Sequence, residues 1–271
     1  MAKELNKIYN VDALEWMATA PKEIDLVLTS PPYNTSRVGR SEGYASRYNS
    51  EQGDRYNMRY DQFNDSKTDQ EYIDWTIKVF DGYDKVLKPN GCVLYNLSYS
   101  SENTSLIWLL IADIIRNTTF TTADCIVWKK NTAIPNNRSK NKLTRICELV
   151  FVFCRKSEIE TFFCNKKVVS TIEKTGQANF ENLFNFIEAA NNDGSNDLNK
   201  ATFSTEFARK LLLMYADEGF TVYDSFMGTG TTAEAAIIEN MKYVGTELSE
   251  AQCKDAEKRL GIRISQPTLF L

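Results

Sequence analysis

Six consecutive residues, Thr29-Ser30-Pro31-Pro32-Tyr33-Asn34, have the types and order needed for chemistry on a planar amine. Proline fixes φ, restricts the residue before it and has no N–H, so the two prolines stiffen the backbone and leave carbonyls unpaired. Ser30 Oγ and the carbonyls of Ser30 and Pro31 are acceptors, and the Tyr33 ring is a flat stacking surface. Acceptors aimed at a planar amine, with a ring against its face, suit the amino group of a nucleobase.

Hydrogen bonding of this kind would change the reactivity of such an amine. The lone pair of cytosine N4 or adenine N6 is delocalised into the ring. Accepting hydrogen bonds from both N–H groups draws the nitrogen toward sp³ and returns the lone pair for attack on an electrophile. The alternative interpretation is a Pro-Pro turn followed by a buried tyrosine, and the six residues alone leave both interpretations open.

A strand is predicted to position these residues. Residues 24–28 are apolar and rich in aliphatic side chains, which favours a buried parallel strand. The Pro-Pro pair therefore lies at the carboxyl end of this strand, where open α/β sheets bind ligands. Before it, residues 7–12 predict a strand that ends at Asp12, and residues 13–20 predict a short amphipathic helix.

A second stretch, residues 220–232, predicts a strand that runs into a glycine-punctuated turn and then a helix over 233–240. Glycine allows close approach of the backbone to a ligand, and a helix N-terminus favours negative charge. Residues 242–247 predict a further strand ending in Glu247, 19 residues after Gly228. That spacing is typical of a βαβ nucleotide site in which the acid binds ribose hydroxyls. The alternative is an ordinary α/β turn with a solvated glutamate.

Composition narrows the class of protein. The chain has 271 residues, 42% of them hydrophobic, and no apolar run approaches the ~20 residues of a membrane span. The first residues lack the apolar core of a signal peptide. Six cysteines are scattered without a Cys-x-x-Cys pair, so we expect reduced packing residues in a cytoplasmic protein. The chain has no histidine, which excludes a Ser-His or Cys-His nucleophile.

Basic residues are concentrated in two loops, although the net charge is −4. Residues 35–68 are polar and predict a long functional loop in which arginines alternate with tyrosines, and residues 129–145 contain no acidic side chain. Basic residues interleaved with aromatic ones suit contact with phosphates and bases, and a solvated loop is the alternative. The basic residues predicted to contact a nucleic acid are Arg37, Arg40, Arg47, Lys129, Lys130, Arg138 and Lys140.

The rest of the chain alternates between predicted helices and strands. Residues 155–198 are the least regular part, and we interpret them as an insertion. The predicted elements are a helix over 69–87, a turn over 88–91, a strand over 92–97, a helix over 104–117, strands over 125–128 and 147–153, and a helix over 204–217.

Together the two stretches resemble the amino-methyltransferases of DNA, in the circularly permuted group whose catalytic motif precedes the cofactor motif. Residues 29–33 are similar to the family's (Asp/Asn/Ser)-Pro-Pro-(Tyr/Phe) motif. Residues 224–232 resemble its Asp-Pro-Phe-x-Gly-x-Gly-Thr-Thr motif, with Ser225 in place of proline. Residues 87–91 and Glu148 are similar to its Leu-Lys-Pro-Gly-Gly turn and its Glu-hydrophobic strand.

One segment departs from the family pattern. Residues 200–204 resemble a His-Pro-Ala-x-Phe-Pro segment, but Asn199, Lys200 and Ser204 replace the histidine and both prolines. The resemblance covers most of the chain apart from 35–68 and 155–198.

The resemblance implies an α/β, Rossmann-like S-adenosylmethionine-dependent methyltransferase fold. Its sheet would be mixed and mostly parallel, with helices on both faces and a target-recognition insertion. It divides the chain into a catalytic part, 1–154, with 35–68 facing DNA, an insertion, 155–198, and a cofactor-binding part, 199–271. Residues 155–198 would face DNA together with 35–68 and 129–145.

The family also implies S-adenosylmethionine as cofactor and no metal ion. The catalytic residues implied are Ser30, Pro31, Pro32 and Tyr33, with Ser30 and the Pro31 carbonyl orienting the amine. Glu247 would hold the ribose hydroxyls, Asp224 would lie near the amino-acid part and Asp12 near the adenine. The full cofactor set is Asp12, Thr202, Phe203, Asp224, Phe226, Gly228, Gly230, Thr231 and Glu247.

The implied substrate is a base flipped out of double-stranded DNA. Serine before Pro-Pro favours cytosine N4 in this family, with adenine N6 as the alternative. A bacterial or phage origin is expected, and a homodimer and a partner restriction endonuclease both stay open. Two other classes compete: a methyltransferase acting on RNA or a small molecule, and a non-catalytic nucleotide-binding module.

Overall fold

The computed structural model describes residues 4–34, 67–99, 103–133, 135, 140–193 and 202–265. Within these residues the chain forms an eight-stranded sheet in the order β1-β10-β9-β2-β3-β5-β4-β8, and a two-stranded hairpin of β6 and β7. Strands of the large sheet are parallel, except that β5 runs antiparallel to β3 and β4. The strands are β1 (Lys7–Asn10), β2 (Ile24–Thr29), β3 (Leu87–Leu97), β4 (Phe120–Lys130), β5 (Cys147–Arg155), β6 (Val168–Thr171), β7 (Ala178–Phe180), β8 (Phe186–Ala189), β9 (Thr221–Asp224) and β10 (Lys242–Glu247).

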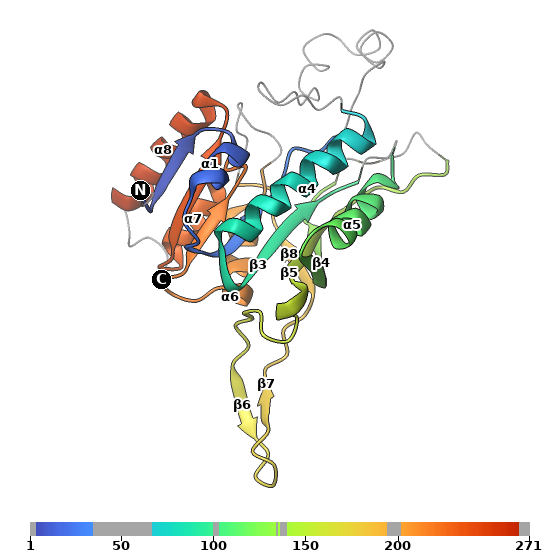
Figure 1. Cartoon of the computed structure of the whole chain (residues 1–271), viewed down its shortest axis with the longest axis vertical. Coiled ribbons are helices and arrows are strands. Elements are labelled where there is room, and N and C mark those ends of the chain that lie inside the picture. Colours follow the sequence, from blue (N-terminus) through green and yellow to red (C-terminus); the bar gives the residue numbers. More distant parts are fainter. Residues whose placement is uncertain are drawn as a thin grey trace.

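Helices cover both faces of the large sheet (Figure 1). One face carries α1 (Ala13–Thr19), α4 (Asp69–Val86) and α5 (Leu106–Asn117). The other carries α6 (Thr205–Tyr215), α7 (Thr231–Ile238) and α8 (Glu250–Ser265). This arrangement confirms the predicted α/β fold with a mixed, mostly parallel sheet.

Side chains that alternate between the two faces of the central strands form two hydrophobic cores, one on each side of the sheet. Successive side chains of a strand point to opposite faces, so a strand buried on both sides is apolar throughout. In β2, Leu26 and Leu28 join the core beneath α6–α8, whereas Val27 joins the core beneath α1, α4 and α5. In β5, Val152 and Phe153 divide between the two cores in the same way.

Polar side chains mark where the helices begin. The Asp12 carboxylate accepts hydrogen bonds from the Leu14 and Glu15 amides at the start of α1. Thr68 and Glu71 form a reciprocal capping box at the start of α4. Ser204 caps α6 through the Phe207 amide. Each cap satisfies backbone N–H groups that have no partner inside the helix.

The predicted turn over 88–91 lies inside β3, and this corrects the sequence prediction. Ile24 pairs with Leu87 and Leu26 pairs with Cys92, so the extra residues of β3 form an irregularity in the ladder. Asn90 has φ 62°, in the left-handed region. The Pro-Asn-Gly sequence thus distorts a strand that continues on both sides of it.

Part of the segment 155–198 belongs to the main sheet. Residues 186–189 form β8, which pairs in parallel with β4. What stands apart from the sheet is the β6–β7 hairpin, which projects from the end opposite the carboxyl ends of β2 and β3 (Figure 1). The hairpin is therefore at the opposite end of the sheet from Thr29 of β2 and Leu97 of β3 (Figure 1).

Neither a membrane-spanning helix nor a cluster of metal ligands occurs among the residues that the structure describes. None of these helices combines the length and apolar character that crossing a bilayer requires. Nor do the described residues hold a group of three or more cysteine, aspartate or glutamate side chains able to bind a metal ion. All six cysteines are free thiols.

Removing the Phe80 side chain should test the core beneath α1, α4 and α5. Phe80 is fully buried, and its ring packs edge-on against Tyr83, Tyr95, Phe120 and Phe153. Phe80→Ala should lower the free energy of unfolding by about 3–5 kcal/mol, as large-to-small core substitutions do.

Equilibrium urea unfolding measures this effect, with Leu109→Ala on α5 as the control. Leu109 is 51% exposed, so its substitution should change the free energy by less than about 1 kcal/mol. Equal effects of the two substitutions would contradict the assignment of Phe80 to the core.

Candidate active site

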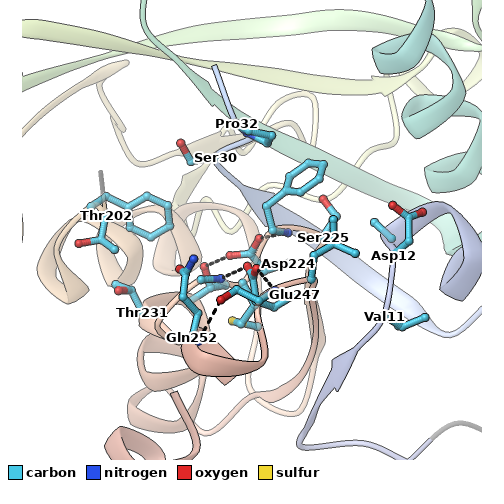
Figure 2. A pocket seen from close by; sticks show the side chains of 18 of the residues that line it. Val11, Asp12, Ser30, Pro32, Thr202, Asp224, Ser225, Thr231, Glu247 and Gln252 are labelled. Carbon is cyan, nitrogen blue, oxygen red and sulfur yellow. Dashed lines mark hydrogen bonds between the residues drawn. The ribbon is translucent and has the colours of Figure 1, made fainter. Parts of the chain in front are cut away.

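A pocket lies at the carboxyl ends of β2, β9 and β10. Ser30 and Pro32 lie above Asp224 and Glu247 in the view of Figure 2. Val11 and Asp12 lie on one side of this pair, and Thr202, Thr231 and Gln252 lie on the other. The pocket is lined by Val11, Asp12, Ala13, Ser30, Pro32, Tyr33, Trp75, Thr202, Phe203, Asp224, Ser225, Phe226, Met227, Gly228, Thr231, Thr232, Glu247, Leu248, Ser249 and Gln252.

Asp224 ends β9 and is the most buried carboxylate of the pocket, at 2% exposure. Its Oδ1 accepts from Thr29 Oγ1 at 2.6 Å and from the Phe226 amide at 3.0 Å, and its Oδ2 accepts from Thr232 Oγ1 at 2.6 Å. Burial raises the pKa of Asp224 to about 6, although the three hydrogen bonds favour the ionised form. Asp224 thereby joins the end of β2 to the turn after β9.

Glu247 ends β10 and is fixed by backbone amides. Its Oε2 accepts from the Gly228 amide at 2.9 Å and its Oε1 accepts from the Ser249 amide at 2.8 Å. Strands β9 and β10 are parallel neighbours, with Gly245 opposite Asp224. This pairing explains why an acid 19 residues after Gly228 reaches the glycine turn.

The two glycines of the turn have different roles. Gly228 lines the pocket with φ 55°, and Gly230 caps α7 with φ 87°. Both are in the left-handed region that side chains disfavour. Gly230 does not line the pocket, because it faces α8. A Cβ at Gly230 would lie 3.0 Å from the Ala256 Cβ, so glycine here allows α7 and α8 to pack closely.

The Ser30–Tyr33 segment is held by contacts on both sides of the two prolines. The Pro32 carbonyl accepts from Tyr72 OH of α4 at 3.1 Å. Ser30 Oγ lies 3.1 Å from Tyr33 OH. Ser30, Pro32 and Tyr33 line the pocket, whereas Pro31 is buried and does not. The segment thus contributes a hydroxyl and an aromatic ring to the lining of the pocket that also contains Asp224 and Glu247.

This pocket combines carboxylates, aromatic rings and a glycine turn, and a known family shares the sequence that forms it. The N6/N4 DNA methylase family matches residues 24–258. The chain belongs to this DNA methylase family. The match extends from the start of β2 to α8 and so includes both stretches that line the pocket.

Type II methyltransferases are among the curated relatives of this DNA methylase. M.HinfI of Haemophilus influenzae is 25% identical over 270 residues, which cover 94% of this chain and 68% of that protein. M.BglII of Bacillus subtilis is 23% identical over 268 residues, covering 92% of this chain and 67% of that protein. M.MjaI of Methanocaldococcus jannaschii is 24% identical over 282 residues, covering 95% and 92%.

Solved structures agree with the fold of this DNA methylase. PvuII DNA methyltransferase, described as cytosine-N4-specific, superposes with a TM-score of 0.69 at 17% identity, covering 95% of this chain and 87% of that one. M1.HpyAVI in complex with S-adenosylmethionine superposes with a TM-score of 0.57 at 18% identity, covering 94% and 98%. At these identities the likeness concerns the fold.

The structure brings most predicted site residues of the methylase into one pocket. Pro31 and Gly230 are the predicted catalytic and cofactor residues that do not line it. Among those that do, Asp12 also caps α1, and Thr231 Oγ1 accepts from Arg259 Nη1 at 3.0 Å.

Sequence reasoning missed several lining residues. Trp75 comes from the middle of α4, 5.5 Å from the Phe226 ring, and was predicted only as a helix residue. Ser249 and Gln252 lie around the start of α8, a helix that the sequence analysis did not predict. The sequence signal for Ser249 and Gln252 was their position shortly after Glu247. Because Glu247 ends β10, the residues that follow it lie near the carboxyl end of that strand.

The basic residues predicted to contact DNA divide into two groups. Arg37, Arg40, Arg47 and Arg138 lie outside the described residues. Among the others, Lys140 is exposed, Lys129 forms an ion pair with Glu188, and Lys130 forms one with Glu148.

Titration of Asp224 should make the stability of the methylase depend on pH. Its pKa rises from 3.8 to about 6 in the folded protein, so its proton is bound more tightly there. Its contribution to stability is fully present below about pH 4 and is lost as the pH rises through about 6. Because one unit corresponds to 1.36 kcal/mol, the loss is about 3 kcal/mol.

Asp224→Asn removes this titration and keeps the shape of the side chain. The free energy of unfolding of the native sequence minus that of Asp224→Asn should fall by about 3 kcal/mol from pH 4 to pH 7. Urea unfolding across this pH range measures the difference. A difference that does not change with pH would contradict the raised pKa.

Proposed function

We propose that this DNA methylase transfers a methyl group from S-adenosylmethionine to the exocyclic amine of a flipped base, with cytosine N4 favoured over adenine N6. One observation carries the proposal. The Ser30–Tyr33 segment and the two acids Asp224 and Glu247 line the same pocket, so an amine acceptor site and a nucleoside site adjoin. A methyl transfer needs both substrates held together in line.

The lining residues fit S-adenosylmethionine by their chemistry. Carboxylates suit its ammonium group and ribose hydroxyls, and the Trp75 and Phe226 rings suit a purine. We assign Glu247 to the ribose hydroxyls, Asp224 to the amino-acid part and Asp12 to the adenine side. The complex of M1.HpyAVI with S-adenosylmethionine supports the cofactor assignment. When bound, S-adenosylmethionine supplies a methyl group already activated on its sulfonium.

The residues of this chain contribute orientation and acceptors. An amine inside the base stack cannot reach the pocket, so the base flips out of the duplex, which costs a few kcal/mol. Stacking on the Tyr33 ring returns about 1–3 kcal/mol. Ser30 Oγ accepts from one amine N–H, which helps to restore the nitrogen lone pair for attack. The Pro31 carbonyl, predicted to accept from the other N–H, belongs to a residue outside the pocket lining. The Tyr72 hydroxyl fixes the backbone of this segment through the Pro32 carbonyl.

Cytosine N4 is favoured because the first acceptor is a neutral hydroxyl. Serine before Pro-Pro accompanies N4 methylation in the family that this chain resembles. The PvuII enzyme, described as cytosine-N4-specific, supports the same assignment. Adenine N6 uses the same geometry and is the alternative.

Loops at the same end of the sheet are proposed to bind the duplex. Residues 35–68 come after β2 in the sequence, and residues 129–145 begin with the last two residues of β4. Both strands end at the edge that carries the pocket. Basic residues there would contact phosphates, with Lys140 as the exposed described example. The type II names of M.HinfI and M.BglII support pairing with a restriction endonuclease in the cytoplasm of a bacterial host.

Nucleoside analysis of methylated DNA should identify the product. The purified protein is incubated with S-adenosylmethionine and mixed-sequence duplex DNA, and the digested DNA is analysed by mass spectrometry. We expect N4-methylcytosine, and Ser30→Ala should lower its rate of formation by about 100-fold, since it removes an acceptor from the reacting group. N6-methyladenine would keep the mechanism and overturn the base assignment. Methylation of RNA alone would overturn the DNA substrate.

Glu247→Ala should weaken cofactor binding. It removes the acceptor proposed for the ribose and leaves the Gly228 and Ser249 amides without their carboxylate. Loss of hydrogen bonds to a charged group costs about 1.5–3 kcal/mol, or about 10- to 150-fold in Kd for S-adenosylmethionine. Calorimetry measures the Kd, with Glu250→Ala as the control because Glu250 is exposed and pairs with Lys254. Equal Kd values for the two variants would overturn the role of Glu247.

A further inference from the structure

A mostly buried carboxylate contacts the tyrosine of the Ser30–Tyr33 segment. Glu148 is on β5, and its side chain is 11% exposed. Its Oε1 forms an ion pair with Lys130 at the end of β4, whose side chain is 24% exposed. Lys130 was predicted to contact DNA, but its ammonium contacts Glu148.

The second carboxylate oxygen faces the proposed target-base site. Glu148 Oε2 accepts from Asn96 Nδ2 at 2.9 Å and from Tyr33 OH at 3.4 Å. Asn96 is a buried residue of β3, and its Nδ2 also lies 3.1 Å from Tyr33 OH. Side chains from two neighbouring strands, β3 and β5, therefore converge on one phenolic hydroxyl, which Ser30 also contacts.

These contacts set the direction of a chain of hydrogen bonds. An ionised carboxylate only accepts, so the single proton of the Tyr33 hydroxyl points to Glu148. The 3.1 Å contact between Ser30 Oγ and Tyr33 OH then takes its proton from Ser30. With that proton committed to Tyr33, Ser30 Oγ acts only as an acceptor. Asn96 Nδ2 lies 3.5 Å away as one donor, and a lone pair is left for an amine N–H.

We propose that Glu148 is a positioning residue that makes Ser30 an acceptor for the target amine, by ordering the chain from Ser30 through Tyr33 to its own carboxylate. The inference rests on the proposed function of the Ser30–Tyr33 segment. Glu148 does not line the pocket, so it acts through Tyr33 and not on the base. The ion pair with Lys130 holds the Glu148 carboxylate in place.

The stability of the fold does not by itself explain the ion pair between Glu148 and Lys130. Withdrawing two charges from water is expensive, and well-packed apolar residues are often as stable as a buried ion pair. A carboxylate is, however, the side chain that accepts hydrogen bonds without donating any. That property is what the direction of the Ser30–Tyr33 bond requires.

The test is the rate of methyl transfer by Glu148→Gln at saturating S-adenosylmethionine and duplex DNA. Glutamine keeps the shape but can donate to Tyr33, which reverses the chain. We expect kcat to fall about 10- to 100-fold, a size typical of misplaced reacting groups. The Kd for S-adenosylmethionine should stay within about twofold, because Glu148 is outside the pocket. Glu188→Gln is the matched control, since Glu188 pairs with Lys129 on the neighbouring strand.

A double-mutant cycle separates positioning from a structural role. In a Tyr33→Phe background there is no phenolic hydroxyl to orient, so adding Glu148→Gln should lower kcat by less than about twofold further. If Glu148→Gln folds poorly, Glu148→Gln with Lys130→Met removes both charges of the buried pair and still lacks the carboxylate. This pair of substitutions should show the same fall in kcat.

The outcomes distinguish a failure of the proposed function from a failure of the inference about Glu148. If the native sequence methylates neither DNA base, the proposed function fails and this inference fails with it. If the native sequence methylates DNA and either Glu148 variant keeps its kcat, only the inference is overturned. Full additivity of Tyr33→Phe and Glu148→Gln would also overturn it, because the two residues would then act independently.

Discussion

The buried hydrogen bonds of Asp224 hold the pocket together. One carboxylate joins the last residue of β2, through Thr29, to the first turn of α7, through Thr232. These partners are far apart in the sequence, and the β2–β9 ladder itself aligns only Leu26 with Val222 and Val27 with Tyr223. The carboxylate is therefore what fixes the Ser30–Tyr33 segment at a constant distance from the glycine turn. Joining β2 to α7 in this way requires a buried carboxyl group, and its burial raises the pKa of Asp224.

Local signals in the sequence were enough to predict the elements that carry the pocket. The strand before Ser30, the strand before Gly228 and the strand ending at Glu247 all form as predicted, because short apolar runs bounded by proline, glycine or an acid leave little choice. Their proximity in space could also be predicted, because the carboxyl ends of parallel strands meet at one edge of a sheet. The spacing from Gly228 to Glu247 could be interpreted from a single βαβ unit, without any contact to a distant part of the chain.

Other features depend on contacts that local patterns do not encode. Trp75 belongs to a helix whose register against the sheet decides which side chains reach the pocket. The charge of Lys130 suggested a nucleic acid partner, yet its partner is a carboxylate on the adjacent strand. Residues 186–189 look irregular in sequence and become β8 only because β4 offers a free edge. In each case the deciding interaction comes from a separate element.

The strand order has a consequence for how the chain is made. Strands β2, β3, β5 and β4 are translated first and can pair with one another, but β9, which covers the other edge of β2, follows after residue 220. Until then, an apolar strand has an unpaired edge, and such edges favour association with other chains. Joining the β9–α8 segment ahead of β1 by circular permutation would shorten the exposure, because β9 would then be waiting when β2 emerges.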